Sequence, residues 1–464
     1  MMNHARVKAL KGNGKTVSKK AIKSGRASGA STPRGSPLPS LLTSPSHSAA
    51  QSRVTSDVSD EDVDFELDDM ASSVYSGGSG EEMTDEPDTH IFDVNAFMTS
   101  IKDRKRNNGE MREQSLSLYI HKIRHQYTAE THLWLDDAAS ELAELFLHDA
   151  NRAATAKERL LSLQAFVLTV GTVDNLEIYD SAQRILKQIL VDDDDDDCRV
   201  YAIYALCMTV LYAGGMEEAA LEVMEYFVEI VRTDGEHIDA HDNVVIVAAA
   251  LQGWCFVASH VADFSDYADA AMDAFVDQLD SDDVEIQSNA GGCIALIFEA
   301  SRHHLEETGE PFQLQYDPQR LADRMRELAK LSAKSVSRKH RRNLRESLVS
   351  VVTSLERGVG PFYSTAQYIP EKGEHVPASL RTDEGRAEYG YRCKLRLNSQ
   401  VAKVDNWSLY FRVNFMRIIF KGGLQHHVFI NPVVTECLDD AEFVQDYSPL
   451  QKPPKGRKNI SSTS

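Results

Sequence analysis

The sequence predicts an all-α protein: an α-solenoid of armadillo- or HEAT-like helix pairs, with a small C-terminal helical module and a disordered N-terminal arm. Three observations lead there. From Met111 onward, apolar residues recur at helical spacing almost throughout. Helices start roughly every 20 residues, so helix pairs repeat roughly every 40, which is typical of repeats that bury their faces only against neighbours. No clear strand signal appears before residue 375.

Composition and spacing divide the chain into segments. These are a disordered arm, basic and then acidic (1–100), the helical repeat domain (101–358), a linker (359–394), the C-terminal helical module (395–445) and a disordered basic tail (446–464). With 42% hydrophobic residues, the chain can bury a sizeable core. No apolar run approaches the roughly 18 residues of a membrane span, and the N-terminus has no signal-peptide core. We therefore expect a protein of the cytoplasm and nucleus, with no membrane partner.

Within the repeat domain, the stops between helices are explicit. Gly171 and Gly235 follow apolar stripes, where a helix C-cap favours glycine. The run Asp192–Asp197 ends one helix and is expected to cap the next at its positive end. The segment Asn243–His260 is apolar on every side, which is typical of a helix buried in the middle of a stack. Beyond the repeats, Lys394–Leu397 alternates and predicts one short strand.

A long basic helix is expected from Leu328 to Arg357. Leu344, Leu348 and Leu355 form its apolar stripe. Its first half holds six cations in twelve residues, although the protein carries a net charge of -21. Charge is segregated: residues 129–300 carry -28 and residues 301–464 carry +7.

We interpret the basic stretch as an anion-binding face for RNA phosphate or an acidic protein, with an ordinary solvated helix face as the alternative. The predicted RNA- or partner-binding residues, which include the basic tail, are Lys334, Arg338, Lys339, His340, Arg341, Arg342, Arg345, Lys452, Lys455, Arg457 and Lys458.

The C-terminal module is expected to begin with a helix at Val404. Trp407 there is more typical of a core anchor than of a recognition residue. The predicted anchors of this module are Trp407, Phe411, Gly422, Gly423, His426 and Asn431. In the arm, five positions next to prolines or acids are candidate phosphorylation sites, with a simple solubilising tail as the alternative: Thr32, Ser36, Ser44, Ser56 and Ser59.

No motif points to catalysis. The sequence has no metalloprotease HExxH, no Cys/His cluster, no GxSxG and no complete phosphate loop. The pairs His303-His304 and His426-His427 are adjacent, so on a helix their rings point about 100° apart and cannot chelate one metal. We predict no catalytic residue, no metal, no cofactor and no small-molecule substrate.

Three blocks resemble the interferon-related developmental regulator family. Lys102–Ile123 (KDRKRNNGEMREQSLSLYIHKI) is similar to the start of the family's repeat region. Ser335–Gly358 (SVSRKHRRNLRESLVSVVTSLERG) is similar to the basic helix that ends the repeats. Leu395–Val434 is similar to the family's C-terminal module and is the most specific block, because its Trp, Gly-Gly, His and Asn fall in order at matching intervals.

The resemblance implies a non-enzymatic regulator built on an armadillo-like array. Family members are described as transcriptional co-regulators and as ribosome-binding proteins that hold ribosomes inactive. Two hypotheses follow. In the first, the chain is a ribosome- or RNA-associated translational repressor that uses the basic helix and the C-terminal module. In the second, it is a nuclear co-regulator scaffold that binds only proteins, through a concave helical surface with acidic repeats. An enzyme is the least favoured alternative.

Overall fold

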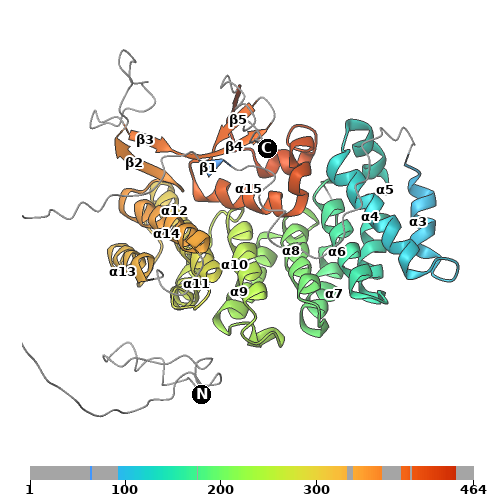
Figure 1. Ribbon diagram of the computed structural model, residues 1–464, viewed down its shortest axis with the longest axis horizontal. Coiled ribbons are helices and arrows are strands. Elements are labelled where there is room, and N and C mark those ends of the chain that lie inside the picture. Colours follow the sequence, from blue (N-terminus) through green and yellow to red (C-terminus); the bar gives the residue numbers. More distant parts are fainter. Residues whose placement is uncertain are drawn as a thin grey trace, which may run out of the picture. The chain divides into compact units, whose positions relative to one another are not determined.

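The computed structural model of the protein describes residues 63–64, 92–174, 176–331, 338–367, 388–397 and 400–445 (Figure 1). All of them belong to one unit, Val58–Ser464. Helices dominate this part of the chain, and they pack as successive pairs, which confirms the predicted fold class.

The array opens with α3 (Val94–Lys102) and α4 (Gly109–His125). The helical array therefore begins slightly before the predicted start at residue 101, because Phe97, Met98 and Ile101 of α3 are buried against α4 and α5. The pairs that follow are α5 (Ala129–Arg152) with α6 (Ala156–Val170), α7 (Tyr179–Asp192) with α8 (Asp196–Tyr212), α9 (Glu217–Arg232) with α10 (Val244–Ala258), α11 (Ser265–Gln278) with α12 (Val284–Thr308), and α13 (Pro318–Leu331) with α14 (Arg338–Arg357).

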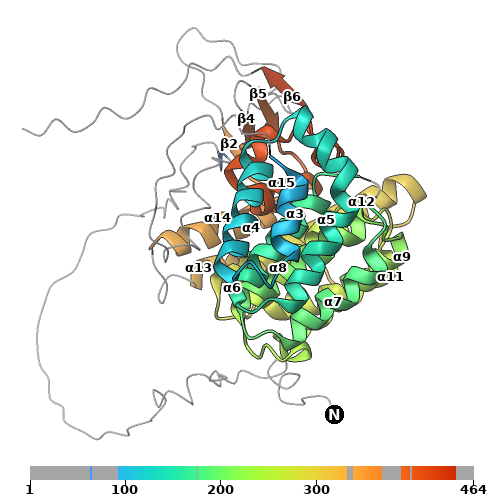
Figure 2. The same cartoon turned by 90° about the vertical axis from the view of Figure 1, so that its right-hand side faces the viewer.

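The second helices of the pairs form a continuous row. Along it α4 contacts α6, and the contacts continue through α8, α10 and α12 to α14. Figure 2 looks onto the α3–α5 end of this row. We call α6, α8, α10, α12 and α14 the inner row and their partners the outer row. Helix α10, in the middle, is apolar on every side because it contacts α8, α9, α12 and the later helix α15.

Two of the predicted stops between helices are present, whereas α9 has Thr233 as its C-cap and Gly235 follows two residues later. Helix α6 ends at Val170 with Gly171 as its C-cap. The aspartate run separates α7 from α8, and the Asp195 side chain accepts the backbone N–H of Cys198 at 3.0 Å. The same carboxylates lie at the N-terminus of α8, where the helix dipole favours negative charge.

One long helix from Leu328 to Arg357 was expected, and this prediction is wrong. The chain forms two helices, α13 and α14, that pack against each other in antiparallel order. Gln319 at the start of α13 and Arg326 further along both bond Glu356, which lies near the end of α14. The apolar stripe behind this prediction lies entirely within α14 and did not locate where that helix begins, whereas pairing buries apolar side chains of both helices.

The strands are short. β2 (Tyr363–Gln367) and β3 (Glu388–Tyr391) form an antiparallel ribbon within the expected linker 359–394. A second sheet has the order β1 (Val63–Asp64), β4 (Cys393–Leu397), β5 (Gln400–Lys403) and β6 (Phe443–Gln445), in which β1 runs parallel to β4. The predicted strand Lys394–Leu397 lies in β4, whose side chains alternate between buried and partly exposed. The other strands were not predicted, since a few residues carry little periodicity.

The C-terminal segment contains α15 (Trp407–Phe420), the short 3-10 helix η3 (Lys421–His426) and α16 (Pro432–Cys437). Helix α15 runs crosswise over the inner row and contacts α6, α10 and α12 (Figure 1). Helix α15 therefore packs on the repeat array of its own chain.

Candidate functional site

The apolar stripe of α15 is buried against the inner row. The ring of Phe415 stacks on Phe256 of α10, with centroids 3.8 Å apart and planes 6° apart. Tyr204 of α8 meets the Phe415 ring edge-on at 5.4 Å. Phe411 reaches Gly292 of α12, where an added Cβ would lie only 2.8 Å from the ring. This side of the inner row is thus covered by the protein itself.

The N-terminus of α15 is capped by a residue from another helix. The buried Glu299 of α12 accepts the backbone N–H groups of Trp407 at 2.8 and 2.9 Å and of Ser408 at 3.0 Å. Burial raises the pKa of the Glu299 carboxyl, while the two amides act in the opposite direction. The indole Nε1 of Trp407 donates to Ser354 Oγ of α14 at 3.0 Å. Trp407 therefore joins α12, α14 and α15.

A second junction binds η3 and α16 to the first helices. His427 and Asn431 are fully buried. Nε2 of His427 donates to the Ile123 carbonyl at 3.0 Å, so its Nδ1 accepts from the Asn431 amide, also at 3.0 Å. The same amide donates to the Gly171 carbonyl at 2.8 Å. This hydrogen-bonded chain connects the ends of α4 and α6 to the C-terminal segment.

His426 was the histidine predicted as an anchor of the C-terminal module. The structure places His427 in this junction and leaves His426 exposed. No sequence signal distinguished two adjacent histidines. Gly423 lies against α4, where an added Cβ would stand 1.9 Å from the Arg124 carbonyl oxygen, whereas Gly422 has nothing within 4 Å. The predicted anchors other than His426 and Gly422 thus contact the repeat array.

The basic stretch lies on α14. Arg338, Arg341, Arg342 and Arg345 follow the spacing i, i+3, i+4 and i+7, which places them on one helix face. Leu344 and Leu348, which follow the same spacing on another face, are buried. Arg345 is exposed, and Arg342 pairs with Glu346 at 2.8 Å.

His340 is exposed and Arg341 half-buried. The structure does not describe the side chains of Arg338 and Lys339. Several predicted site residues lie wholly outside the described residues: Lys334, Lys452, Lys455, Arg457, Lys458, Thr32, Ser36, Ser44, Ser56 and Ser59.

Helices α9 and α11 of the outer row are strongly acidic. On α11, Asp266, Asp273 and Asp277 are exposed, and on α9, Glu218 and Glu222 are exposed. The acidic charge of this part of the sequence therefore lies on the exposed surface of these helices. Such a surface repels nucleic acid and attracts cationic partners.

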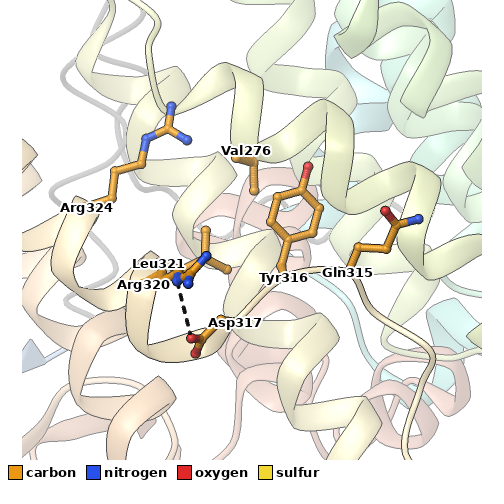
Figure 3. A pocket seen from close by; sticks show the side chains of 7 residues that line it. All are labelled: Val276, Gln315, Tyr316, Asp317, Arg320, Leu321 and Arg324. Atoms are coloured by element: carbon orange, nitrogen blue, oxygen red, sulfur yellow. Dashed lines mark ion pairs between the residues drawn. The ribbon is translucent and has the colours of Figure 1, made fainter. Parts of the chain in front are cut away.

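A cavity of about 240 Å³ lies between α11 and the start of α13 (Figure 3). Its polar groups bond within the protein: Arg320 pairs with Asp317 at 3.7 Å, and Arg324 with Asp280 at 2.8 Å. Because these charges are paired, the cavity indicates no ligand chemistry. Its lining is Val276, Gln315, Tyr316, Asp317, Arg320, Leu321 and Arg324.

No group of three or more His, Cys, Asp or Glu side chains in the described ranges is arranged to hold a metal ion. Among the helices described, none has the length and apolarity that crossing a bilayer requires. All six cysteines are buried, and none of them forms a disulfide bond.

Fold and site together define a helical-repeat protein whose own C-terminal helix covers its inner row. The family model of the interferon-related developmental regulators matches residues 67–356, more than half of the chain, so the protein belongs to that family. This match includes the first two resembling blocks, apart from the last residues of the second, and ends before the third.

Two further proteins are similar to this chain. An uncharacterized protein of Schizosaccharomyces pombe is 20% identical over 355 residues, which cover 73% of this chain and 72% of the relative. The crystal structure of an engineered protein aligns with 56% of this chain and 98% of its own, at 15% identity and a TM-score of 0.35.

Proposed function

We propose that the protein is a non-enzymatic regulator of gene expression, and specifically a ribosome- or RNA-associated translational repressor. The observation that supports this proposal is the arginine face of α14, which follows the acidic repeats of residues 129–300. Exposed Arg and Lys on one helix face bind phosphates through charge-assisted hydrogen bonds. In this proposal α14 contacts ribosomal RNA, and the acidic outer row faces solvent or protein.

The alternative, a co-regulator scaffold that binds proteins only, has a narrower basis. The scaffold hypothesis requires an open concave surface. In the structure, α15 occupies the inner row at α6, α10 and α12. The surface left to such a partner is the acidic outer row, which suits basic segments. We therefore place the scaffold second.

The test is sedimentation of a lysate on a sucrose gradient. We expect the protein to co-migrate with ribosomes, and the triple variant Lys339→Glu, Arg341→Glu and Arg342→Glu to sediment freely. Because phosphate contacts release counterions, binding should also fall steeply with salt.

A charge-matched control carries Arg106→Glu, Arg184→Glu and Arg232→Glu, at exposed positions outside α14. The control should still co-migrate with ribosomes. Free sedimentation of the unmodified protein in both fed and starved cells would favour the scaffold instead.

A further inference from the structure

A buried arginine lies at the end of α4, and one of its nitrogen atoms is unpaired within the described residues. Arg124 is 8% exposed, and its Nε has no partner among the described residues. Among the described residues, no carboxylate offsets the burial of its guanidinium, and Tyr201 is the group that acts on its pKa in the direction opposite to burial. A buried guanidinium left unpaired is costly, so burial lowers the pKa of Arg124. Such a group is a candidate for an external anion.

Other basic side chains gather around Arg124. His121 and His125 lie one turn apart on α4, with ring centroids 5.1 Å apart. Lys421 and His426, at the two ends of η3, belong to the same electrostatic neighbourhood as His125. Burial, followed by the charges of His121 and Arg124, lowers the pKa of His125 to about 4.

The cluster is held in place by backbone contacts. η3 lies so close to the end of α4 that only glycine fits at position 423, against the Arg124 carbonyl. The hydrogen bond from His427 to the Ile123 carbonyl fixes the same contact. Arg124, Lys421 and the neighbouring histidines therefore converge by construction of the fold. One acid, Asp197 at the start of α8, faces Lys421 and partly offsets its charge.

We propose that Arg124, Lys421 and the exposed rings of His121, His125 and His426 bind the phosphate backbone of single-stranded RNA. This inference rests on the proposed function and names a second RNA contact, at the opposite end of the inner row from α14. A guanidinium fork binds phosphate in bidentate fashion. Exposed imidazoles offer stacking faces to unpaired bases, which favours RNA over an acidic peptide.

The test compares Arg124→Met with Lys122→Met in the full chain. Lys122→Met is the matched control, because it removes the same charge from the same helix. The amine of Lys122 donates a hydrogen bond to the Gln126 side chain at 3.3 Å. The probes are inorganic phosphate, followed by calorimetry, and a labelled oligouridine, followed by fluorescence anisotropy across a salt series. We expect Arg124→Met to lose phosphate binding, to bind RNA about tenfold more weakly and to reduce the salt slope by about one.

The melting temperature serves as an independent control for correct folding of the variants. Arg124→Met removes an unpaired buried charge, so its melting temperature in phosphate-free buffer should equal or exceed that of the unmodified chain. The surface double variant His121→Ala and His125→Ala, which leaves the buried residue in place, should weaken RNA binding several-fold through lost stacking.

The outcomes separate the two proposals. Equal binding of both probes by Arg124→Met and Lys122→Met would overturn the site. Loss of phosphate binding with unchanged RNA binding would overturn its assignment to RNA. If Arg124 governs binding of both probes but the protein never sediments with ribosomes, the site stands and the ribosomal role fails.

Discussion

The carboxylate of Glu299 on α12 binds the backbone of Trp407, 108 residues later, at the first turn of α15. A helix leaves its first N–H groups without internal partners, and here Glu299 accepts two of them while Asn406 accepts that of Leu409 at 2.7 Å. The docking of α15 on the inner row is therefore coupled to the formation of the helix itself.

Replacing Glu299 with Ala should loosen the start of α15. The variant leaves two buried amides unpaired and removes a negative charge from the helix N-terminus, a loss of about 2 kcal/mol or more. Hydrogen exchange should be faster at the amides of Trp407 and Ser408. Glu307→Ala, at an exposed position on the same helix, is the control and should leave exchange there unchanged.

The Phe415–Phe256 stack should be the main apolar attachment of α15. Phe415→Ala creates a cavity between α10 and α15 and should lower the unfolding free energy by about 3–5 kcal/mol in urea titrations. Phe429 is 58% exposed, so Phe429→Ala serves as the matched control and should cost much less. Equal losses in the two variants would show that α15 is not held through this ring.

Burial makes His427 sensitive to acid. Desolvation lowers the pKa of this ring to about 3, so the unfolded chain takes up the proton more readily than the folded one. Stability is therefore complete above the unfolded pKa of about 6.5 and is lost as pH falls from there toward 3. Through this one group, the unfolding free energy should fall by up to about 1.4 kcal/mol per pH unit.

Comparing unfolding at pH 7 and pH 5.5 checks this expectation. His427→Gln should be less stable at pH 7, because the Ile123 and Asn431 contacts change, but should lose less on acidification. His426→Gln alters the exposed neighbour. Its unfolding free energy should fall on acidification as much as that of the unmodified protein. Since burial likewise lowers the pKa of His260 to about 3, part of the acid sensitivity should persist in both variants.

The sequence was informative about which segments are buried and much less about what buries them. The all-apolar Asn243–His260 correctly predicted a central helix, and the helix expected at the start of the C-terminal module is present as α15. An apolar stripe does not indicate which surface it packs against, so the docking of α15 on the inner row could not be predicted from the sequence. The break between α13 and α14 was also missed, because the stripe that predicted the long helix lies wholly within α14 and did not locate its start.

The candidate site shows the same limit. The cations of α14 were visible as a local cluster, since they lie within one turn or two of each other. Arg124 and Lys421 lie almost 300 residues apart and meet only because η3 closes onto α4. That contact depends on the Gly422-Gly423 pair, whose two members looked equivalent in the sequence.

The two glycines provide the sharpest test of this contact. At position 423 a methyl group would stand 1.9 Å from the Arg124 carbonyl, and backbone cannot yield as a flexible side chain can; at position 422 it would meet nothing within 4 Å. Gly423→Ala should therefore displace η3 and lower the unfolding free energy by several kcal/mol, about the scale of a severe overpacking. Gly422→Ala should change it by about 0.5 kcal/mol or less, measured in the same denaturant titration. Equal stability of the two variants would mean that η3 does not rest on α4, and the convergence of Arg124 with Lys421 would then have no structural basis.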